Sequence, residues 1–292
     1  MNWTPPSAMR ADSAALDRML DMDAEDALDG AGPCGLSVCI LASGSKGNAI
    51  YVSDGATSLL VDAGLSGIDI QRRMEWAGLC PERLSAIVVS HEHSDHIRGV
   101  GVLSRRYKLP VYISPDTLKA AGNQMGRLHD IRPFHIGRSF AINDLALHPF
   151  ATSHDAQDPA GFTISRNGQK VGIATDLGVA TGMVRQHLKN CTLLVLEANH
   201  DPDMLVNGPY PWPLKQRIKS RNGHLSNEDS GHLLAEIQHD GLCHVILAHL
   251  SETNNTPKKA LDTVERALGG AARSFQIHVA CQERCGSLLI LK

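Results

Sequence analysis

The sequence His-Glu-His-Ser-Asp-His occupies residues 91–96 and follows directly on the apolar run Ala-Ile-Val-Val-Ser at residues 86–90. Such a run predicts a buried strand, and the loop after a buried strand is a rigid place from which to hold ligands. In an extended turn His91 and His93 project to the same side, as alternate residues do. Asp95 and His96 can then face a second point, away from the one that the first two histidines face. The stretch therefore indicates a metal site at the end of a strand.

The number of possible ligands in this stretch indicates more than one metal ion. Imidazole and carboxylate groups suit zinc, and also manganese or iron. Four such groups within six residues are too many for one ion that keeps an open coordination position. We therefore expect two divalent ions, zinc or manganese. Glu92 alternates away from the neighbouring histidines, so we expect it to be solvated or structural.

Composition narrows the class of protein. The 292 residues are 42% hydrophobic and 20% charged, which is ordinary for a globular chain that needs no disulfides. The net charge of −3 means that a polyanion would need a local basic patch. Most of the seven cysteines lie in apolar contexts and predict buried thiols in a reducing compartment, and Cys281 with Cys285 lacks a second pair to complete a zinc site. Without an apolar run of ~18–20 residues or a secretory signal, we expect a cytoplasmic protein with no membrane contact.

The amino-acid composition and the hydrophobic pattern of the chain change near residue 35. Residues 1–34 combine aspartates with small residues and predict an acidic, loosely attached extension, whereas residues 35–292 predict one catalytic domain. In the second region, apolar β-branched runs predict strands at 36–42, 49–53, 58–62, 85–90, 111–113, 161–165, 171–174, 192–197, 244–248, 274–280 and 286–291. Helical patterns lie at 66–77, 98–107, 116–123, 180–189, 227–239 and 256–268. This order predicts two sheets packed face to face with helices outside, a four-layer αβ/βα sandwich.

The metal-site stretch is accompanied by four further elements, each beside a predicted strand. They are Val-Asp-Ala-Gly at 61–64, His154 after Phe-Ala-Thr-Ser, Asp176 after Gly-Ile-Ala-Thr, and His249 after Val-Ile-Leu-Ala. Together with His-x-His-x-Asp-His, this order resembles the signature of the metallo-β-lactamase superfamily over residues 36–292. The resemblance implies the metallo-β-lactamase fold.

The resemblance also implies roles for individual residues. One metal ion would be held by His91, His93 and His154, and the other by Asp95, His96 and His249, with Asp176 as the bridge and Asp62 as an orienting group outside the ligands. Two cations lower the pKa of a shared water toward neutrality and so supply a hydroxide nucleophile.

Three segments indicate a phosphodiester substrate, although each has a plainer explanation. The turn at residues 43–48, with Ser43, Ser45, Lys46 and Asn48, could hold a phosphate on exposed N–H groups, or be an ordinary hairpin turn. Lys215, Arg217, Lys219 and Arg221 would share a face if the segment is extended and spread around the axis if it is helical; the alternative is a solvated charge run. His224 lies where a helix begins and could protonate a leaving oxygen, or merely sit in a capping loop.

Several stretches narrow the resemblance to the YycJ/WalJ (VicX) branch of the superfamily. They are Ser-Gly-Ser-x-Gly-Asn at 43–48, Leu-Glu-Ala-Asn-His-Asp at 196–201, Gly-His-Leu-Ser-Asn at 223–227 and His-Leu-Ser-x-x-Asn-Asn-Thr-Pro at 249–257. This resemblance implies a two-metal phosphodiesterase acting on nucleic acid, a DNA exonuclease that digests from 5′ to 3′. The alternatives are a small-molecule phosphodiesterase or RNA-processing nuclease, a thioesterase or lactonase, and a non-catalytic signalling regulator. Intact candidates at all seven ligand positions argue against the last.

Overall fold

The computed structural model describes residues 35–269 and 273–292, and the predicted extension at residues 1–34 lies outside these ranges. The strands are β1 (Ser37–Ala42), β2 (Ala49–Ser53), β3 (Ser58–Val61), β4 (Ala86–Val88), β5 (Pro110–Ile113), β6 (Asp130–Pro133), β7 (Phe140–Ile142), β8 (Leu145–Ala151), β9 (Ala160–Arg166), β10 (Gln169–Ala174), β11 (Leu193–Glu197), β12 (His244–Ala248), β13 (Gln276–Val279) and β14 (Leu289–Ile290). The helices are α2 (Gly67–Trp76), α3 (Ser94–Ile97), α4 (Val100–Tyr107), α5 (Pro115–Ala121), α6 (Gly182–Leu188), α7 (Pro202–Asn207), α8 (Trp212–Ile218), α9 (Asn227–Ile237) and α10 (Pro257–Ala267), with a 3-10 turn at Pro81–Arg83.

These strands form two sheets that are each seven strands wide in the described ranges. Their orders are β14-β1-β2-β3-β4-β5-β6 and β13-β12-β11-β10-β9-β8-β7. In the first sheet β3, β4, β5 and β6 run parallel, and in the second β10, β11, β12 and β13 do. Parallel strands bring their carboxyl ends to one edge of each sheet, and loops at such edges commonly build ligand sites in α/β folds.

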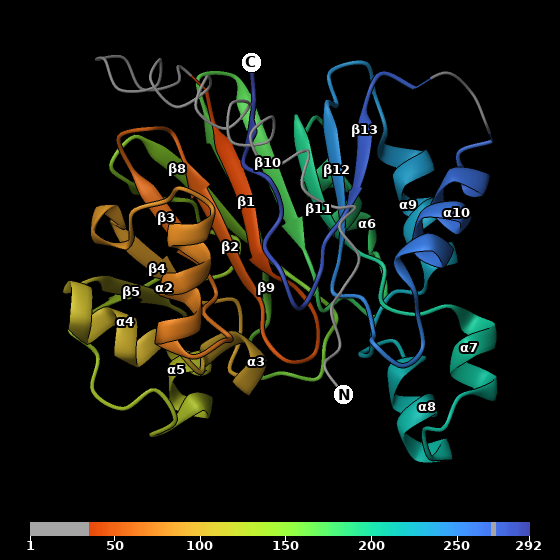
Figure 1. Ribbon diagram of the computed structural model, residues 1–292, viewed down its shortest axis with the longest axis horizontal. Helices are drawn as coiled ribbons and strands as arrows, with labels where there is room; N and C mark the ends of the chain where they lie inside the picture. The colour runs from red at the N-terminus through yellow and green to blue at the C-terminus, as the bar shows by residue number, and fades with distance from the viewer. Residues whose placement is uncertain (1–34, 270–272) are drawn as a thin grey trace, which may run out of the picture. The chain divides into compact units, whose positions relative to one another are not determined.

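Figure 1 shows the two sheets side by side with helices on their outer faces. Three hydrophobic cores hold these layers together. The central core lies between the sheets, where Val38 and Val88 of the first sheet pack with Phe162 of the second. A second core joins the outer face of the first sheet to α2, α4 and α5, and a third joins the outer face of the second sheet to α6, α9 and α10. The predicted four-layer αβ/βα sandwich is therefore confirmed.

The local signals for the later helices behave as expected. Ser226 accepts a hydrogen bond from Asp229 N at the start of α9, and Pro257 occupies the first turn of α10.

The strands β6, β7 and β8 lie outside the predicted strand ranges. β6 contains Asp130, Arg132 and Pro133 on an edge, and β7 has only three residues on the opposite edge, so neither carries an apolar alternating pattern. β8 is longer, but its middle residues are His148 and Pro149, which interrupt the apolar run. These three segments therefore form strands because they pair with neighbouring strands, and not because of a pattern in their own sequences.

Candidate metal centre

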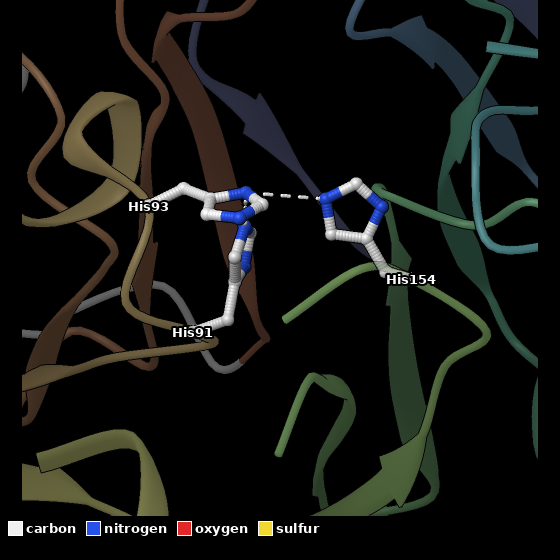
Figure 2. A group of neighbouring side chains, drawn as sticks. All are labelled: His91, His93 and His154. Carbon is white, nitrogen blue, oxygen red and sulfur yellow. Dashed lines mark hydrogen bonds between the residues drawn. The ribbon is translucent and has the colours of Figure 1, made fainter. Parts of the chain in front are cut away.

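Three histidines converge at the carboxyl ends of β4 and β8. His93 Nδ1 lies 3.1 Å from His91 Nε2 and 3.2 Å from His154 Nε2, so the three ring nitrogens face one point (Figure 2). His91 and His93 come from the loop after β4, whereas His154 reaches in from the loop after β8 on the other sheet. Three convergent nitrogens are a usual ligand set for a divalent transition-metal ion.

A second group lies beside the first. Asp95 Oδ2 is 3.6 Å from His96 Nε2 and 3.7 Å from His249 Nε2. Asp95 and His96 lie on the short helix α3, and His249 follows β12. His249 Nε2 is buried and has no hydrogen-bond partner among the described residues. A buried unpartnered nitrogen next to a carboxylate fits a position that a cation fills.

Asp176 lies between the two groups. Its Oδ2 atom is 3.3 Å from His96 Nε2, and its Oδ1 atom is 3.6 Å from His154 Nε2 and 3.6 Å from His249 Nδ1. The residue is almost fully buried, and Oδ2 has no hydrogen-bond partner among the described residues. One carboxylate thus touches both groups, as a bridging ligand would. The fold and this donor set together suit divalent metal ions.

The hydrogen bonds around the histidines fix which ring nitrogen faces the centre. His154 Nδ1 lies 3.2 Å from the Gly223 carbonyl, and His249 Nδ1 lies 2.8 Å from a Glu197 carboxylate oxygen. Both oxygens can only accept, so Nδ1 of each ring carries hydrogen and Nε2 is left toward the centre. His91 Nδ1 lies 2.9 Å from Ser90 Oγ, which donates its own hydrogen to Asp62 and therefore accepts from the ring.

Asp62 lies where the resemblance implies an orienting group. Its Oδ1 accepts from Ser90 N at 2.8 Å, and its Oδ2 accepts from Ser90 Oγ at 2.8 Å and lies 2.8 Å from His96 Nδ1. Carboxylates that hold a ligand imidazole in this way fix its tautomer and ring orientation. Asp62, Asp176 and His249 all stand on left-handed backbone, with φ of 60°, 54° and 56°. Each follows the end of a strand, where the chain must turn sharply.

Sequence reasoning missed Glu197, the last residue of β11. Its side chain is fully buried, and its Oε1 atom lies 2.8 Å from both His224 Nδ1 and His249 Nδ1. The other oxygen accepts from Leu177 N and Leu225 N. Burial alone would raise the pKa of Glu197, but the two histidines and their hydrogen bonds lower it to about 2. The available signal was a glutamate that ends an otherwise apolar strand.

The first group, at the ends of β4 and β8, and the second group, which contains Asp95, differ in electrostatic character. Burial lowers the pKa of His91 and His154, so their nitrogens stay neutral and free to bind a cation. Burial also acts to lower the pKa of His249, but Asp176, Asp95 and Glu197 raise it to about 10. The pKa of His96 is likewise raised well above its usual value, against burial, by Asp176 and Asp62. In the second group, His96 and His249 therefore hold protons whose positive charge balances the surrounding carboxylates. A bound divalent ion would balance that charge instead.

His224 opens onto a cavity of about 240 Å³ beside the centre. Its ring centroid is 5.1 Å from that of His154 and 5.1 Å from that of His249. Of the residues predicted to bind substrate, Ser45 and Arg217 also line this cavity. Arg217 pairs with Asp155, whose other oxygen lies 3.4 Å from His154 Nε2. The cavity therefore connects directly with the centre.

Most backbone N–H groups of the turn at residues 43–48 are bound within the protein. Within it, Gly44 N and Lys46 N donate to Asn48 Oδ1 and Gln282 Oε1, and Gly47 N and Asn48 N donate to carbonyls. Side chains and carbonyls of the protein thus already bind these four N–H groups, and phosphate binding by Ser43, Ser45, Lys46 and Asn48 stays a prediction.

The side chains of this turn point to different parts of the protein. Ser43 Oγ accepts from His249 N at 2.7 Å, and Asn48 Nδ2 lies 3.1 Å from His96 Nε2. Both are thus next to the centre. Lys46 points elsewhere and pairs with Glu252 at 2.8 Å and Glu283 at 3.4 Å.

The basic run does not form one extended face. Lys215 and Arg217 lie on helix α8, Lys219 caps that helix, and Arg221 follows in a turn. Lys215 Nζ donates to Val206 O at 2.7 Å. Lys219 and Arg221 line a second cavity, of about 640 Å³, with Arg185 and His232. Only Arg217 of the four therefore lines the cavity that His224 also lines.

Comparison with known proteins defines the class of this chain. Residues 57–249 match the family described as the beta-lactamase superfamily domain, and the chain belongs to that superfamily. Exodeoxyribonuclease YycJ of Bacillus anthracis is 39% identical over 250 residues, which are 84% of this chain and 95% of the relative. Exodeoxyribonuclease WalJ of Streptococcus pneumoniae is 37% identical over 241 residues, 81% of this chain and 90% of the relative. The predicted membership of the superfamily's hydrolases, and the YycJ/WalJ resemblance, are confirmed.

Solved structures agree on the fold. The metallo-β-lactamase fold protein YhfI from Bacillus subtilis superposes with a TM-score of 0.69 at 18% identity, over 88% of this chain and 99% of that chain. Human tRNase Z, short form, superposes with a TM-score of 0.60 at 16% identity, over 86% and 98%. At these identities the likeness concerns the fold.

The described residues also bear on membranes and thiols. None of the described helices has the length and apolar character needed to cross a bilayer. Six cysteines fall in the described ranges and all are free thiols, with Cys39, Cys191 and Cys285 buried, whereas Cys80 and Cys243 are exposed. Among these residues, no group of three possible metal ligands includes a cysteine.

Proposed function

We propose that this protein is a two-metal phosphodiesterase acting on DNA, an exonuclease that digests from 5′ to 3′. The convergence of His91, His93 and His154 on one side of Asp176, and of Asp95, His96 and His249 on the other, carries the proposal. The exodeoxyribonuclease names of relatives that align over most of their length support nucleic acid, and DNA in particular, as the substrate.

This geometry supports a proposed set of metal ligands. His91, His93 and His154 would hold one ion, Asp95, His96 and His249 would hold the other, and Asp176 would contact both. Either zinc or manganese suits such a set of imidazoles and carboxylates. When bound, two divalent ions supply the positive charge that phosphodiester hydrolysis needs. Asp62 and Glu197 would orient His96 and His249 through their Nδ1 atoms.

His224 would donate the proton that the leaving oxygen takes up. Its Nδ1 atom is bound to Glu197, which leaves Nε2 as the nitrogen that can exchange a proton with a substrate in the adjoining cavity. His224 would thus act as a general acid at Nε2.

The cellular setting is also a proposal. Free thiols at the six described cysteines suit a reducing compartment, so we infer that the protein works in the cytoplasm. Its partner there is nucleic acid, and no membrane contact is needed.

Activity on end-labelled polymers tests the proposed function. Metal-loaded protein should release mononucleotides from DNA labelled at one end, and labels at the two ends should report the polarity. Single- and double-stranded DNA and RNA are compared, with an acyl thioester and a lactone as controls. Metal analysis of the same preparation should give two ions per chain. Cleavage of the thioester or lactone without cleavage of nucleic acid would overturn the proposal, as would full activity with a single bound ion.

A further inference from the structure

The cavity beside His224 has walls of mixed chemistry. Tyr210 precedes helix α8, and the helix itself contributes Leu214, Arg217 and Ile218. Asn199 and Ser251, from the loops after β11 and β12, also line the cavity. An aromatic ring, two aliphatic side chains and a few polar groups are what a flat heteroaromatic ligand requires.

The polar groups of the cavity retain hydrogen-bonding capacity. Asn199 Nδ2 donates to His249 O at 2.8 Å, and Asn199 Oδ1 has no hydrogen bond to any of the described residues. Ser251 Oγ accepts from Asn254 N at 3.1 Å, so its hydroxyl hydrogen remains available. One acceptor and one donor at fixed positions can pair with the edge of a nucleobase.

The size of the cavity limits what it can hold. Its volume of about 240 Å³ lies below the ~300–1,000 Å³ of pockets that enclose drug-sized ligands. One base with its sugar is of the right order, whereas a stacked base pair is not. A nucleotide held here would therefore be unpaired.

The cavity also lies at the right place for a substrate end. His224, in its wall, has Nδ1 only 3.9 Å from Asp176 Oδ1, and Asp155, also in its wall, reaches His154. An occupant is therefore next to the reacting phosphate and not several nucleotides away. The Arg217 guanidinium bonds Asp155 through Nε, and its terminal nitrogens have no hydrogen bond to the described residues.

We propose that this cavity binds the unpaired terminal nucleotide of the substrate, with its base stacked on Tyr210 and its phosphate near Arg217. The inference rests on the proposed nuclease function and names the subsite that selects a single unpaired nucleotide. Base stacking on an aromatic ring tolerates every base, so the subsite favours an unpaired end over any particular sequence.

Two small probes isolate the base from the phosphate. Calorimetric titration of the metal-loaded protein compares 2′-deoxyadenosine 5′-monophosphate with 2-deoxyribose 5-phosphate, which carries the same phosphate and lacks the base. The nucleotide should bind on the order of tenfold to a hundredfold more tightly. Tyr210→Ala should remove this difference, and Tyr210→Phe should keep it. Trp212→Ala is the matched control, because Trp212 is exposed on the same helix and does not line the cavity.

The outcomes separate this proposal from the nuclease proposal. Equal affinity for the two probes in the wild-type protein would overturn the subsite, even if DNA is cleaved normally. The same follows if Tyr210→Ala retains the full preference for the nucleotide. A protein that binds the nucleotide through Tyr210 but cleaves no nucleic acid would overturn the nuclease function and leave the subsite standing.

Discussion

The half-buried imidazole of His224 and the fully buried carboxylate of Glu197 form a pair, with Nδ1 of the ring 2.8 Å from Oε1 of the acid. The same oxygen also lies 2.8 Å from His249 Nδ1. One carboxylate therefore serves the proposed proton donor and a proposed metal ligand together. Separate substitutions of His224 and of Glu197 should distinguish these two roles.

His224→Ala should lower single-turnover cleavage by roughly 10²-fold to 10⁴-fold while leaving the metal content unchanged, because it removes only the proton donor. Glu197→Gln should lower turnover and also weaken metal binding by about 10–100-fold, since His249 loses its anionic partner. Unchanged single-turnover cleavage in His224→Ala would reduce this residue to a structural one.

Asp95→Ala and His96→Ala should abolish hydrolysis and leave the circular dichroism spectrum unchanged, because both side chains face the centre. Glu92→Gln is the matched control from the same stretch. Its carboxylate accepts from Gln157 N at 2.8 Å and does not face the centre, so turnover should persist. Near-normal turnover of either ligand variant at saturating metal would show that its assignment is wrong.

The four cations of the basic run should contribute unequally to DNA binding. Arg217→Ala should weaken binding most, because Arg217 alone of the four lines the cavity with His224. Lys215→Ala should weaken it least, since its ammonium group is bound to Val206 O. For single strands, the slope of log affinity against log salt should become shallower by ~0.7 for each phosphate that a variant no longer binds. Lys189→Ala, at the end of α6 where the second sheet's strands begin, is the control. An unchanged slope in a variant with alanine at Lys215, Arg217, Lys219 and Arg221 together would show that the DNA path lies elsewhere.

The cysteines should differ in reactivity toward iodoacetamide at pH 8. Burial raises the pKa of Cys39 to about 12 and that of Cys191 to about 11, so almost no thiolate is present at either site. Cys80 and Cys243 are exposed and should be alkylated first. Mass spectrometry of peptides after timed alkylation measures the order, and denaturant should expose the buried pair. Early labelling of Cys39 in the native protein would contradict the packing of β1.

The metal-ligand candidates could be predicted because strand ends and imidazole-carboxylate patterns are local signals. His91, Asp176 and His249 each follow an apolar run that is recognisable in the sequence, whereas His154 follows the interrupted strand β8 and is assigned through the family resemblance. Glu197 could not be assigned in this way. Its role depends on two histidines that are 27 and 52 positions away, and nothing in its own neighbourhood indicates their approach.

The substrate-side predictions depend on tertiary contacts that the sequence does not show. The N–H groups of the turn at 43–48 are bound in part by Gln282, which is 236 positions from Lys46. The run Lys215–Arg221 could not be assigned to helix or strand by charge spacing alone. Pro211 and Pro213, which favour the first turn of a helix, were the overlooked signal for α8.

The left-handed backbone at Asp62, Asp176 and His249 bears on how this protein can evolve. Such backbone costs a residue with a side chain about 1 kcal/mol, and three such positions are a noticeable share of the ~5–15 kcal/mol that keeps a domain folded. Glycine would relax the chain at each position, but it would also remove a group that the proposed chemistry uses. Lineages that keep the activity must therefore tolerate a less stable edge of the sandwich, and stabilising substitutions will accumulate in the helices and loops far from it.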